Sequence, residues 1–172
     1  GLPRIPVAMS AVGPAMLRVA GQVADGVLLH PFSTRRYLAE ESLARIGEGL
    51  ERNSRKRHEI DVVSGAFIAT GKDDEAVAKM KEYIRFRISF YCSTRAYWNV
   101  LRLHGLEELG EKLRPFPAAG RWSEMAAQIP DDIVESFAVV GRHDELASKI
   151  AQKYEGLADT LSLFVPTDTE PG

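Results

Sequence analysis

The segment from Ser10 to Met16 has the residue types and spacing of a turn that holds a phosphate group. Its sequence, Ser-Ala-Val-Gly-Pro-Ala-Met, follows a short apolar run and precedes a helical pattern. A helix begins with unpaired backbone N–H groups and the positive end of its dipole, which together attract anions. Gly13 lets a phosphate approach the backbone and Ser10 supplies a hydroxyl. A plain connection between a strand and a helix is the alternative interpretation.

His30 is the histidine best placed for chemistry, because it follows the second apolar run of the chain. Side chains at the carboxyl ends of barrel strands face the active site, which predicts proton transfer or contact with a cofactor for His30. A histidine that is hydrogen-bonded within its loop is the alternative. His58, His104 and His143 fall in a basic loop or near helix ends and are interpreted as structural.

No complete catalytic constellation is present in the sequence, so the catalytic residues stay unassigned. The chain contains no Ser-His-Asp arrangement, no metal-ligand spacing, no G-x-G-x-x-G loop and no Walker loop. Cys92 has no nearby histidine in the sequence, and we interpret it as an inert thiol. Trp98 and Trp122 are typical of a core, with a cover over a substrate pocket as the alternative.

The composition is that of one ordinary globular domain, and it excludes several classes of function. The 172 residues are 45% hydrophobic and 27% charged. The net charge of −2 provides no basic field for nucleic acid or an anionic membrane, and the basic stretch Arg52–Arg57 is interpreted as a solvated turn. No apolar run approaches the ~20 residues of a membrane span. We therefore expect a cytoplasmic protein without nucleic-acid or membrane partners.

Hydrophobic periodicity predicts strands that alternate with helices, which is typical of a parallel sheet covered by helices. Apolar runs predict four short strands, at residues 5–9, 27–29, 60–70 and 161–165. Amphipathic spacing predicts helices at residues 14–24, 34–50, 74–91 and 144–154. Gly47 and Gly49 predict an irregular end to the second helix. Residues 94–137 are predicted to be helical but broken by glycine and proline, and Ala138–Gly141 to lead into the last helix.

Several segments spread over the chain carry a family resemblance. They are Pro6–His30, with its Ala-Val-Gly-Pro-Ala-Met-Leu turn and Ala-Asp-Gly-Val, Phe67–Gly71, Phe90–Tyr97, Gly120–Met125, Phe137–Gly141 and the last strand. Together they resemble the luciferase-like monooxygenases, which are flavin- or deazaflavin-dependent oxidoreductases. The combination is similar to a subgroup that uses the deazaflavin coenzyme F420. The resemblance implies a TIM barrel, of which this chain would hold strands five to eight.

The resemblance also implies a reaction and a cofactor site. It implies hydride transfer between a deazaflavin or flavin and a small organic substrate, with coenzyme F420 as the cofactor and FMN as the alternative. The implied cofactor-binding residues are Ser10, Ala11, Gly13, Pro14, Ala15 and Met16 around the phosphate, with Gly26 and His30 close to the ring system. Residues 94–137 would be an insertion after strand seven, near the mouth where the substrate enters.

The chain departs from the family pattern because the first four strands of the barrel are absent. Four strands cannot close an eight-stranded barrel, and an open half leaves sheet edges and an apolar face uncovered. We expect residues 1–172 to form a single domain that is completed either by an N-terminal half of the same protein or by a second copy in a homo-oligomer. The chain alone is expected to be inactive. The alternative function is a non-catalytic flavin-binding or oligomerisation module that lacks a complete active site.

Overall fold

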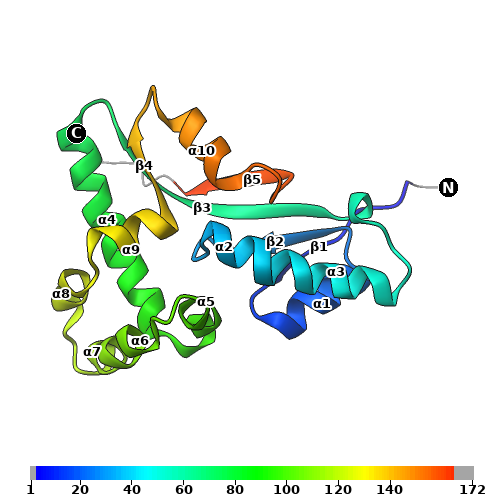
Figure 1. The fold of residues 1–172 in the computed structure, drawn as a ribbon, viewed down its shortest axis with the longest axis horizontal. Coiled ribbons are helices and arrows are strands. Elements are labelled where there is room, and N and C mark those ends of the chain that lie inside the picture. Colours follow the sequence, from blue (N-terminus) through cyan, green and yellow to red (C-terminus); the bar gives the residue numbers. More distant parts are fainter. Residues whose placement is uncertain (1–2, 165–172) are drawn as a thin grey trace.

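The computed structural model describes residues 3–164, which form a single five-stranded sheet with helices packed on it (Figure 1). Every pair of neighbouring strands is parallel. The strands are β1 (Ala8–Ala11), β2 (Gly26–Leu29), β3 (Asp61–Gly71), β4 (Ala138–Arg142) and β5 (Thr160–Phe164). The predicted α/β class with a parallel sheet is therefore confirmed.

The long strand β3 organises the sheet, because it pairs with three other strands. Its first residues, Asp61–Ser64, pair with β2, and its last residues, Phe67–Gly71, pair with β4. β5 pairs with Val63–Phe67, which overlaps both of these stretches, so β5 occupies the opposite edge of β3. Side by side in the sheet, the spatial order is thus β1, β2, β3 and β5. β4 lies on the same side of β3 as β2, beyond the end of β2.

The sequence pattern misses β4, which the structure forms from Ala138 to Arg142. Its apolar stretch is short and directly follows helix α9 (Asp131–Phe137), so periodicity does not separate it from the end of that helix. The strand exists because its backbone pairs with the distant second half of β3. β1 also begins later than predicted, at Ala8, since Pro6 has no N–H to give to a ladder.

The helices fall into two groups. Those that alternate with strands are α1 (Pro14–Val23), α2 (Arg35–Tyr37), α3 (Leu43–Arg52), α4 (Asp74–Ser93) and α10 (Leu146–Tyr154). The stretch predicted to be broken and helical contains 3-10 turns at Arg95–Tyr97 and Ala126–Gln128, with α5 (Trp98–Leu103), α6 (Glu107–Leu113), α7 (Pro115–Ala118), α8 (Trp122–Met125) and α9. This second group packs beside α4 at one end of the molecule (Figure 1).

The irregular part of the second predicted helix lies at its start rather than at its end. Leu38–Ser42 forms a π-helical turn between α2 and α3, whereas Gly47 and Gly49 lie inside regular helix. Gly49 faces Gly21 of α1, and a Cβ added to Gly49 would come within 2.1 Å of the Arg18 carbonyl oxygen. The glycines of α3 therefore serve the close crossing of α1 and α3, which the sequence pattern alone does not reveal.

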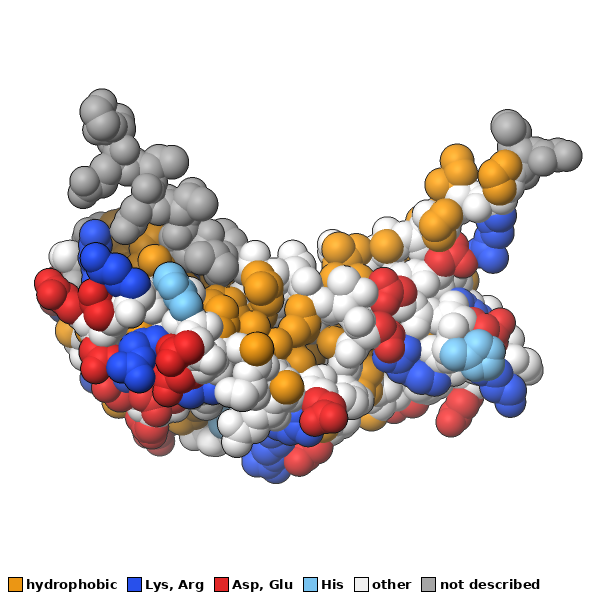
Figure 2. Space-filling model, turned by 90° about the horizontal axis from the view of Figure 1, so that it is seen from above, with side chains coloured by type: hydrophobic (Ala, Val, Ile, Leu, Met, Phe, Trp, Pro, Cys, Tyr) orange, Lys and Arg blue, Asp and Glu red, His pale blue; other side chains and the backbone are white. Residues whose placement is uncertain are grey.

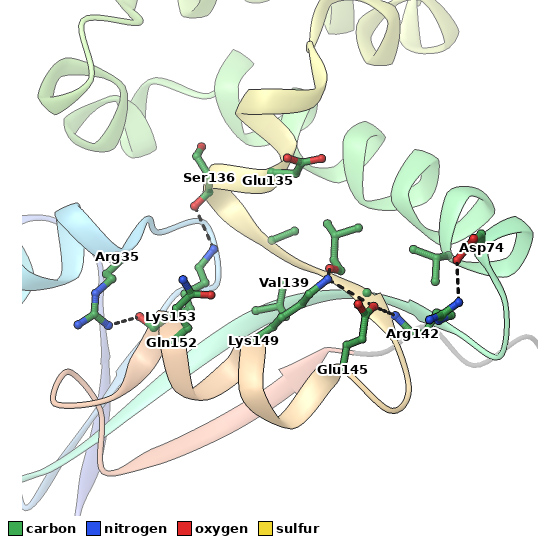
Figure 3. Close-up of a pocket in the computed structure, with 14 residues that line it drawn as sticks. Arg35, Asp74, Glu135, Ser136, Val139, Arg142, Glu145, Lys149, Gln152 and Lys153 are labelled. Carbon is green, nitrogen blue, oxygen red and sulfur yellow. Dashed lines mark hydrogen bonds and ion pairs between the residues drawn. The ribbon is translucent and has the colours of Figure 1, made fainter.

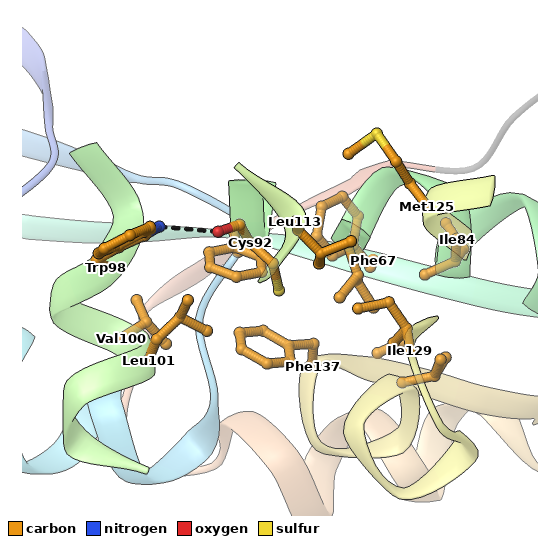
Figure 4. Packing of buried hydrophobic residues seen from close by; sticks show 14 of the residues in the cluster. Phe67, Ile84, Cys92, Trp98, Val100, Leu101, Leu113, Met125, Ile129 and Phe137 are labelled. Atoms are coloured by element: carbon orange, nitrogen blue, oxygen red, sulfur yellow. Dashed lines mark hydrogen bonds between the residues drawn. The ribbon is translucent and has the colours of Figure 1, made fainter. Parts of the chain in front are cut away.

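Two hydrophobic clusters hold these elements together. One lies between the sheet and the helices α1, α3 and α10, and includes Leu17, Val27 and Val62. The other lies between the far half of β3, α4 and the helices of residues 94–137, and includes Phe67, Ile88 and Trp98 (Figure 4). Within this second cluster the Trp98 indole N–H donates to the Cys92 carbonyl at 2.8 Å.

Large apolar side chains remain exposed around β1, α1 and the open face of the sheet. Leu28 points away from the helices that bury its neighbours Val27 and Leu29, and it is 40% exposed. Further exposed apolar residues are Ile5, Val7, Val12, Met16, Val19, Val23 and Leu163. Figure 2 shows hydrophobic side chains along the middle of one face of the molecule and along the N-terminal segment. Among the described residues, no helix has the length and apolar character needed to cross a membrane.

Candidate functional site

The turn between β1 and α1 has the backbone of an anion-binding turn. Gly13 precedes the helix with φ 84° and ψ 160°, a conformation that favours glycine, and it provides no side-chain cap. Pro14 occupies the first helical position, and the first helical hydrogen bond runs from the Leu17 N–H to the Gly13 carbonyl. The N–H groups of Ala15 and Met16 therefore precede the helical ladder and point out of its end.

Asn99 of α5 approaches this turn from the helical segment of residues 94–137. A Cβ placed on Gly13 would lie 3.7 Å from Asn99 Nδ2. Arg102 donates to Asn99 Oδ1 at 2.7 Å, and because arginine only donates, this bond identifies the oxygen and leaves the amide nitrogen toward the turn. The turn is thus faced by a side-chain donor that the sequence pattern gives no means of finding, since α5 follows far along the chain.

His30 lies just beyond β2 and is held by its own loop. The Phe32 N–H donates to His30 Nδ1 at 3.0 Å, and the Ser33 hydroxyl donates to the His30 carbonyl at 3.0 Å. The imidazole ring packs against Tyr91 and Tyr97, with ring centroids 4.6 and 4.7 Å away. Burial, and then the nearby charge of Arg87, lowers the pKa of His30 to about 4.

A small cavity of about 20 Å³ joins the turn to His30. It is lined by Ala11 and Gly13 from the turn, by His30, and by Tyr97 and Asn99 from the helical segment. The residues that line it also include Val12, Leu17, Leu29, Phe32, Ser33, Tyr37, Ser42, Ala96 and Val100, and none of them is an aspartate or glutamate. The cavity therefore offers hydrogen-bond donors and aromatic rings without a carboxylate that would repel an anion.

The structure brings most of the predicted site residues together, but not all. Ala11 is buried, and Pro14, Ala15 and Met16 are exposed at the start of α1. Ser10 is exposed one residue before the end of β1. Gly26 lies at the opposite, amino end of β2, where it pairs with Ala8 and Asp61. A Cβ on Gly26 would come within 3.2 Å of Ala8 Cβ, so tight strand packing accounts for this glycine.

A groove of about 680 Å³ lies elsewhere, between α9, β4 and α10 (Figure 3). Lys153 Nζ donates to the Ser136 carbonyl at 2.9 Å, and Lys149 Nζ donates to the Val140 carbonyl at 2.9 Å. Burial lowers the pKa of Lys153 to about 7. These lysines satisfy backbone carbonyls beside β4, and the groove holds none of the residues that the sequence singles out for cofactor binding.

Cys92 and Asp73 both have structural roles. Cys92 is buried, and burial raises the pKa of its thiol to about 12. Asp73 caps α4 by accepting a hydrogen bond from the Ala76 N–H at 2.9 Å, as expected for a helix start. No three His, Cys, Asp or Glu side chains of the described residues gather closely enough to hold a metal ion.

Comparison with known proteins shows the same family over almost the whole chain. A family model described as luciferase-like monooxygenase matches residues 1–160. An uncharacterized protein of Mycobacterium tuberculosis is 38% identical over 170 residues, which are 98% of this chain and 49% of that protein. The 5,10-methylenetetrahydromethanopterin reductase of Methanopyrus kandleri is 29% identical over 150 residues, or 86% of this chain and 41% of that enzyme. The chain spans about half the length of the curated relatives that it matches.

Solved structures agree with this assignment. The coenzyme F420 dependent tetrahydromethanopterin reductase from Methanopyrus kandleri matches with a TM-score of 0.74 and 26% identity, over 92% of this chain and 45% of that chain. An F420-dependent secondary alcohol dehydrogenase has the same fold, with a TM-score of 0.64 and 14% identity over 94% of this chain and 43% of that chain. With the family model matched over residues 1–160, the chain belongs to the luciferase-like monooxygenase family, an oxidoreductase family with F420-dependent members.

Proposed function

We propose that this chain supplies the cofactor-phosphate site of an oxidoreductase that transfers a hydride between coenzyme F420 and a small organic substrate. The observation that carries the proposal is the turn at Gly13, where α1 begins without a side-chain cap and faces the Asn99 amide. The likeness to an F420-dependent reductase over 92% of the chain supports the same cofactor. FMN, which also carries a phosphate group, is the alternative.

The residues of the turn fit the phosphate group of such a cofactor. The N–H groups of Ala15 and Met16 are charge-assisted donors to a phosphate oxygen at the positive end of the helix dipole. Asn99 adds a side-chain donor, and Ser10 adds a hydroxyl at the adjoining strand end. Gly13 keeps the space in front of the backbone open, since it has no Cβ there. When bound, the deazaflavin supplies the hydride chemistry, and these residues supply binding and orientation.

We also propose that the open face of the sheet is covered by further β/α units. Leu28 lies on that face, and β1 and β5 are edge strands of the order β1, β2, β3, β5. Parallel sheets are normally buried on both faces, because their connections place other elements there. The covering units come either from the other half of a longer barrel protein or from a second copy of this chain. Residues 94–137 then form an insertion beside the cofactor site.

The cofactor proposal is tested by titrating coenzyme F420 into the chain by calorimetry, with inorganic phosphate as a competitor. Asn99→Asp keeps the size of the side chain but replaces its donor by a carboxylate, and we expect F420 affinity to fall by about tenfold or more. Asn53→Asp is the matched control, since Asn53 donates to the Gln22 carbonyl at the far end of α1. Equal affinities for the two variants, or no competition by phosphate, would contradict the proposal.

A second function is favoured by the exposed apolar face, which suits an oligomerisation module that retains the phosphate turn. If this function is correct, the chain binds F420 or FMN, but it oxidises no reductant even when further β/α units cover the open face of the sheet. Turnover by the chain combined with its completing half, but not by the chain alone, distinguishes the oxidoreductase from this alternative.

A further inference from the structure

The ring of His30 is locked in one protonation pattern by the backbone. The Phe32 N–H donates to His30 Nδ1 at 3.0 Å. A backbone amide is a donor and nothing else, so Nδ1 must present its lone pair, and the proton of the neutral ring must be on Nε2. The position of the proton on the imidazole therefore follows from the loop geometry alone.

The surroundings of His30 also favour the neutral ring. Tyr91 and Tyr97 pack against it at centroid distances of 4.6 and 4.7 Å, and no carboxylate is among the groups that shift its pKa. The charge that acts on it is the guanidinium of Arg87, which donates to the Tyr91 hydroxyl at 3.3 Å. Burial and this positive charge both disfavour a second proton on the ring. The pKa of about 4 is therefore consistent with a neutral ring that carries its one proton on Nε2.

The other ring nitrogen of His30 has no hydrogen-bond partner among residues 3–164. His30 lines the small cavity that also reaches Gly13 and Asn99. The cavity of about 20 Å³ has room for roughly one water molecule, so a ligand at this place must extend out of the cavity rather than be enclosed in it. A ligand whose phosphate is held at the start of α1 and that reaches into this cavity therefore comes close to the His30 ring.

We propose that His30 is a permanent hydrogen-bond donor, whose Nε2–H binds an acceptor oxygen on the ribityl chain or ring of the deazaflavin. This inference rests on the proposed function, and it assigns His30 a role in binding and positioning. His30 is then not a general base, because the nitrogen toward the ligand carries a proton and the other nitrogen is occupied by the Phe32 N–H. Tyr91 and Tyr97 hold the ring plane in place.

Two variants separate the donor from the support that His30 gives to its loop. His30→Asn places an amide oxygen near the position of Nδ1, where it accepts from the Phe32 N–H, but it has no group at the position of Nε2. His30→Gln places an amide N–H near the position of Nε2 but loses the acceptor for Phe32. We expect His30→Asn to weaken binding of F420 by about fivefold and His30→Gln to retain most of the affinity. Equal weakening by both variants, or by neither, would overturn the proposal.

The probe for this contact is a phosphate-free deazaflavin that keeps the ring and the ribityl chain. His30→Asn should weaken its binding by the same factor as for F420, whereas Asn99→Asp should weaken the binding of F420 alone. Suppose that inorganic phosphate competes with F420 for the wild-type chain while His30→Asn binds both deazaflavins with unchanged affinity. In that case the His30 proposal fails and the phosphate site stands. If the wild-type chain binds neither deazaflavin, both proposals fail.

A readout without any ligand comes from nitrogen NMR of the imidazole. We expect the shift and coupling pattern of a neutral ring that is protonated at Nε2, unchanged from pH 5.5 to pH 8. Burial raises the pKa of the nearby Tyr97 phenol, and the Arg87 guanidinium stays charged, so neither changes its protonation across that range. A ring protonated at Nδ1, or a ring that titrates near pH 6.5, would overturn the proposal.

Discussion

Gly13 is the residue on which the geometry of the phosphate turn depends most. Its φ of 84° and ψ of 160° lie in a region that costs other residues about 1–3 kcal/mol. We expect Gly13→Ala to lower the free energy of unfolding by about that amount and to weaken F420 binding, because the turn must rearrange. Urea denaturation and calorimetry measure the two effects.

The control for Gly13 is Gly105, which also has a positive φ, 65°, and has no atoms near the position of a Cβ. Gly105→Ala should lower stability without changing the affinity for F420, because Gly105 does not line the cavity beside the turn. A loss of affinity in Gly105→Ala equal to that in Gly13→Ala would show that binding follows stability and not the turn.

His30 predicts a dependence of stability on pH. The pKa of His30 is lowered to about 4 in the folded chain from its usual 6.5, so the unfolded chain takes up a proton first as the pH falls. The contribution of His30 to stability is therefore complete above pH 6.5 and decreases between pH 6.5 and pH 4. The unfolding free energy of His30→Asn, measured by urea denaturation, should fall less over this range than that of the wild-type chain. Parallel curves for the two proteins would contradict the shift.

Individual site residues are predictable from the sequence where their role depends only on residues next to them in the chain. Gly13 and Pro14 mark the turn, and Asp73 marks the start of α4, because capping and turn chemistry are local. Asn99 and Tyr91 are not predictable, since their roles arise only when α4 and α5 fold back over the ends of the strands. The sequence also gives no reason to separate Gly26 from the site, because the order of residues in β2 does not reveal that its amino end is remote from the turn.

At the scale of elements, the crossing of α1 and α3 fixes the direction in which α1 points its first N–H groups. A Cβ on Gly21 would come within 2.2 Å of the Ile46 carbonyl oxygen. A Cβ on Gly49 would come within 2.1 Å of the Arg18 carbonyl oxygen. We expect Gly21→Ala to lower the unfolding free energy by about 1–3 kcal/mol, because the helices must separate. Thermal and urea denaturation measure the change.

Gly47 is the matched control for this crossing. It lies in the same helix, α3, but a Cβ there would meet nothing within 4 Å. Gly47→Ala should therefore raise stability by about 0.5–1 kcal/mol through helix propensity alone. If Gly21→Ala and Gly47→Ala change stability in the same direction, the close crossing is not what these glycines provide.

Elements with a strong local signal are predictable, and elements made by distant pairing are not. The helix α4 follows from a long amphipathic pattern, and strands β2, β3 and β5 follow from apolar runs between turns. β4 is missed because a short apolar run becomes a strand only by pairing with β3, and the π-helical turn Leu38–Ser42 has no sequence signature. The end of the last predicted strand, Val165, lies outside the described residues.

For the whole molecule, the exposed apolar face predicts association. Burying apolar surface contributes about 25 cal/mol per Å², so the open sheet face at Leu28 and the exposed α1 side chains Met16, Val19 and Val23 each favour contact with another body. We expect light scattering at micromolar concentration to give a mass above that of one chain, and Leu28→Glu to lower it. A monomeric mass with cooperative unfolding would contradict this prediction.

We propose above all that the first turn of α1 holds the phosphate of a deazaflavin. The most direct measurement is a crystal structure of the chain with coenzyme F420. We expect phosphate density within about 3 Å of the Ala15 and Met16 N–H groups, close to Asn99. Density for the cofactor at another place, with this turn empty, or no cofactor in the crystal at saturating F420, would contradict it.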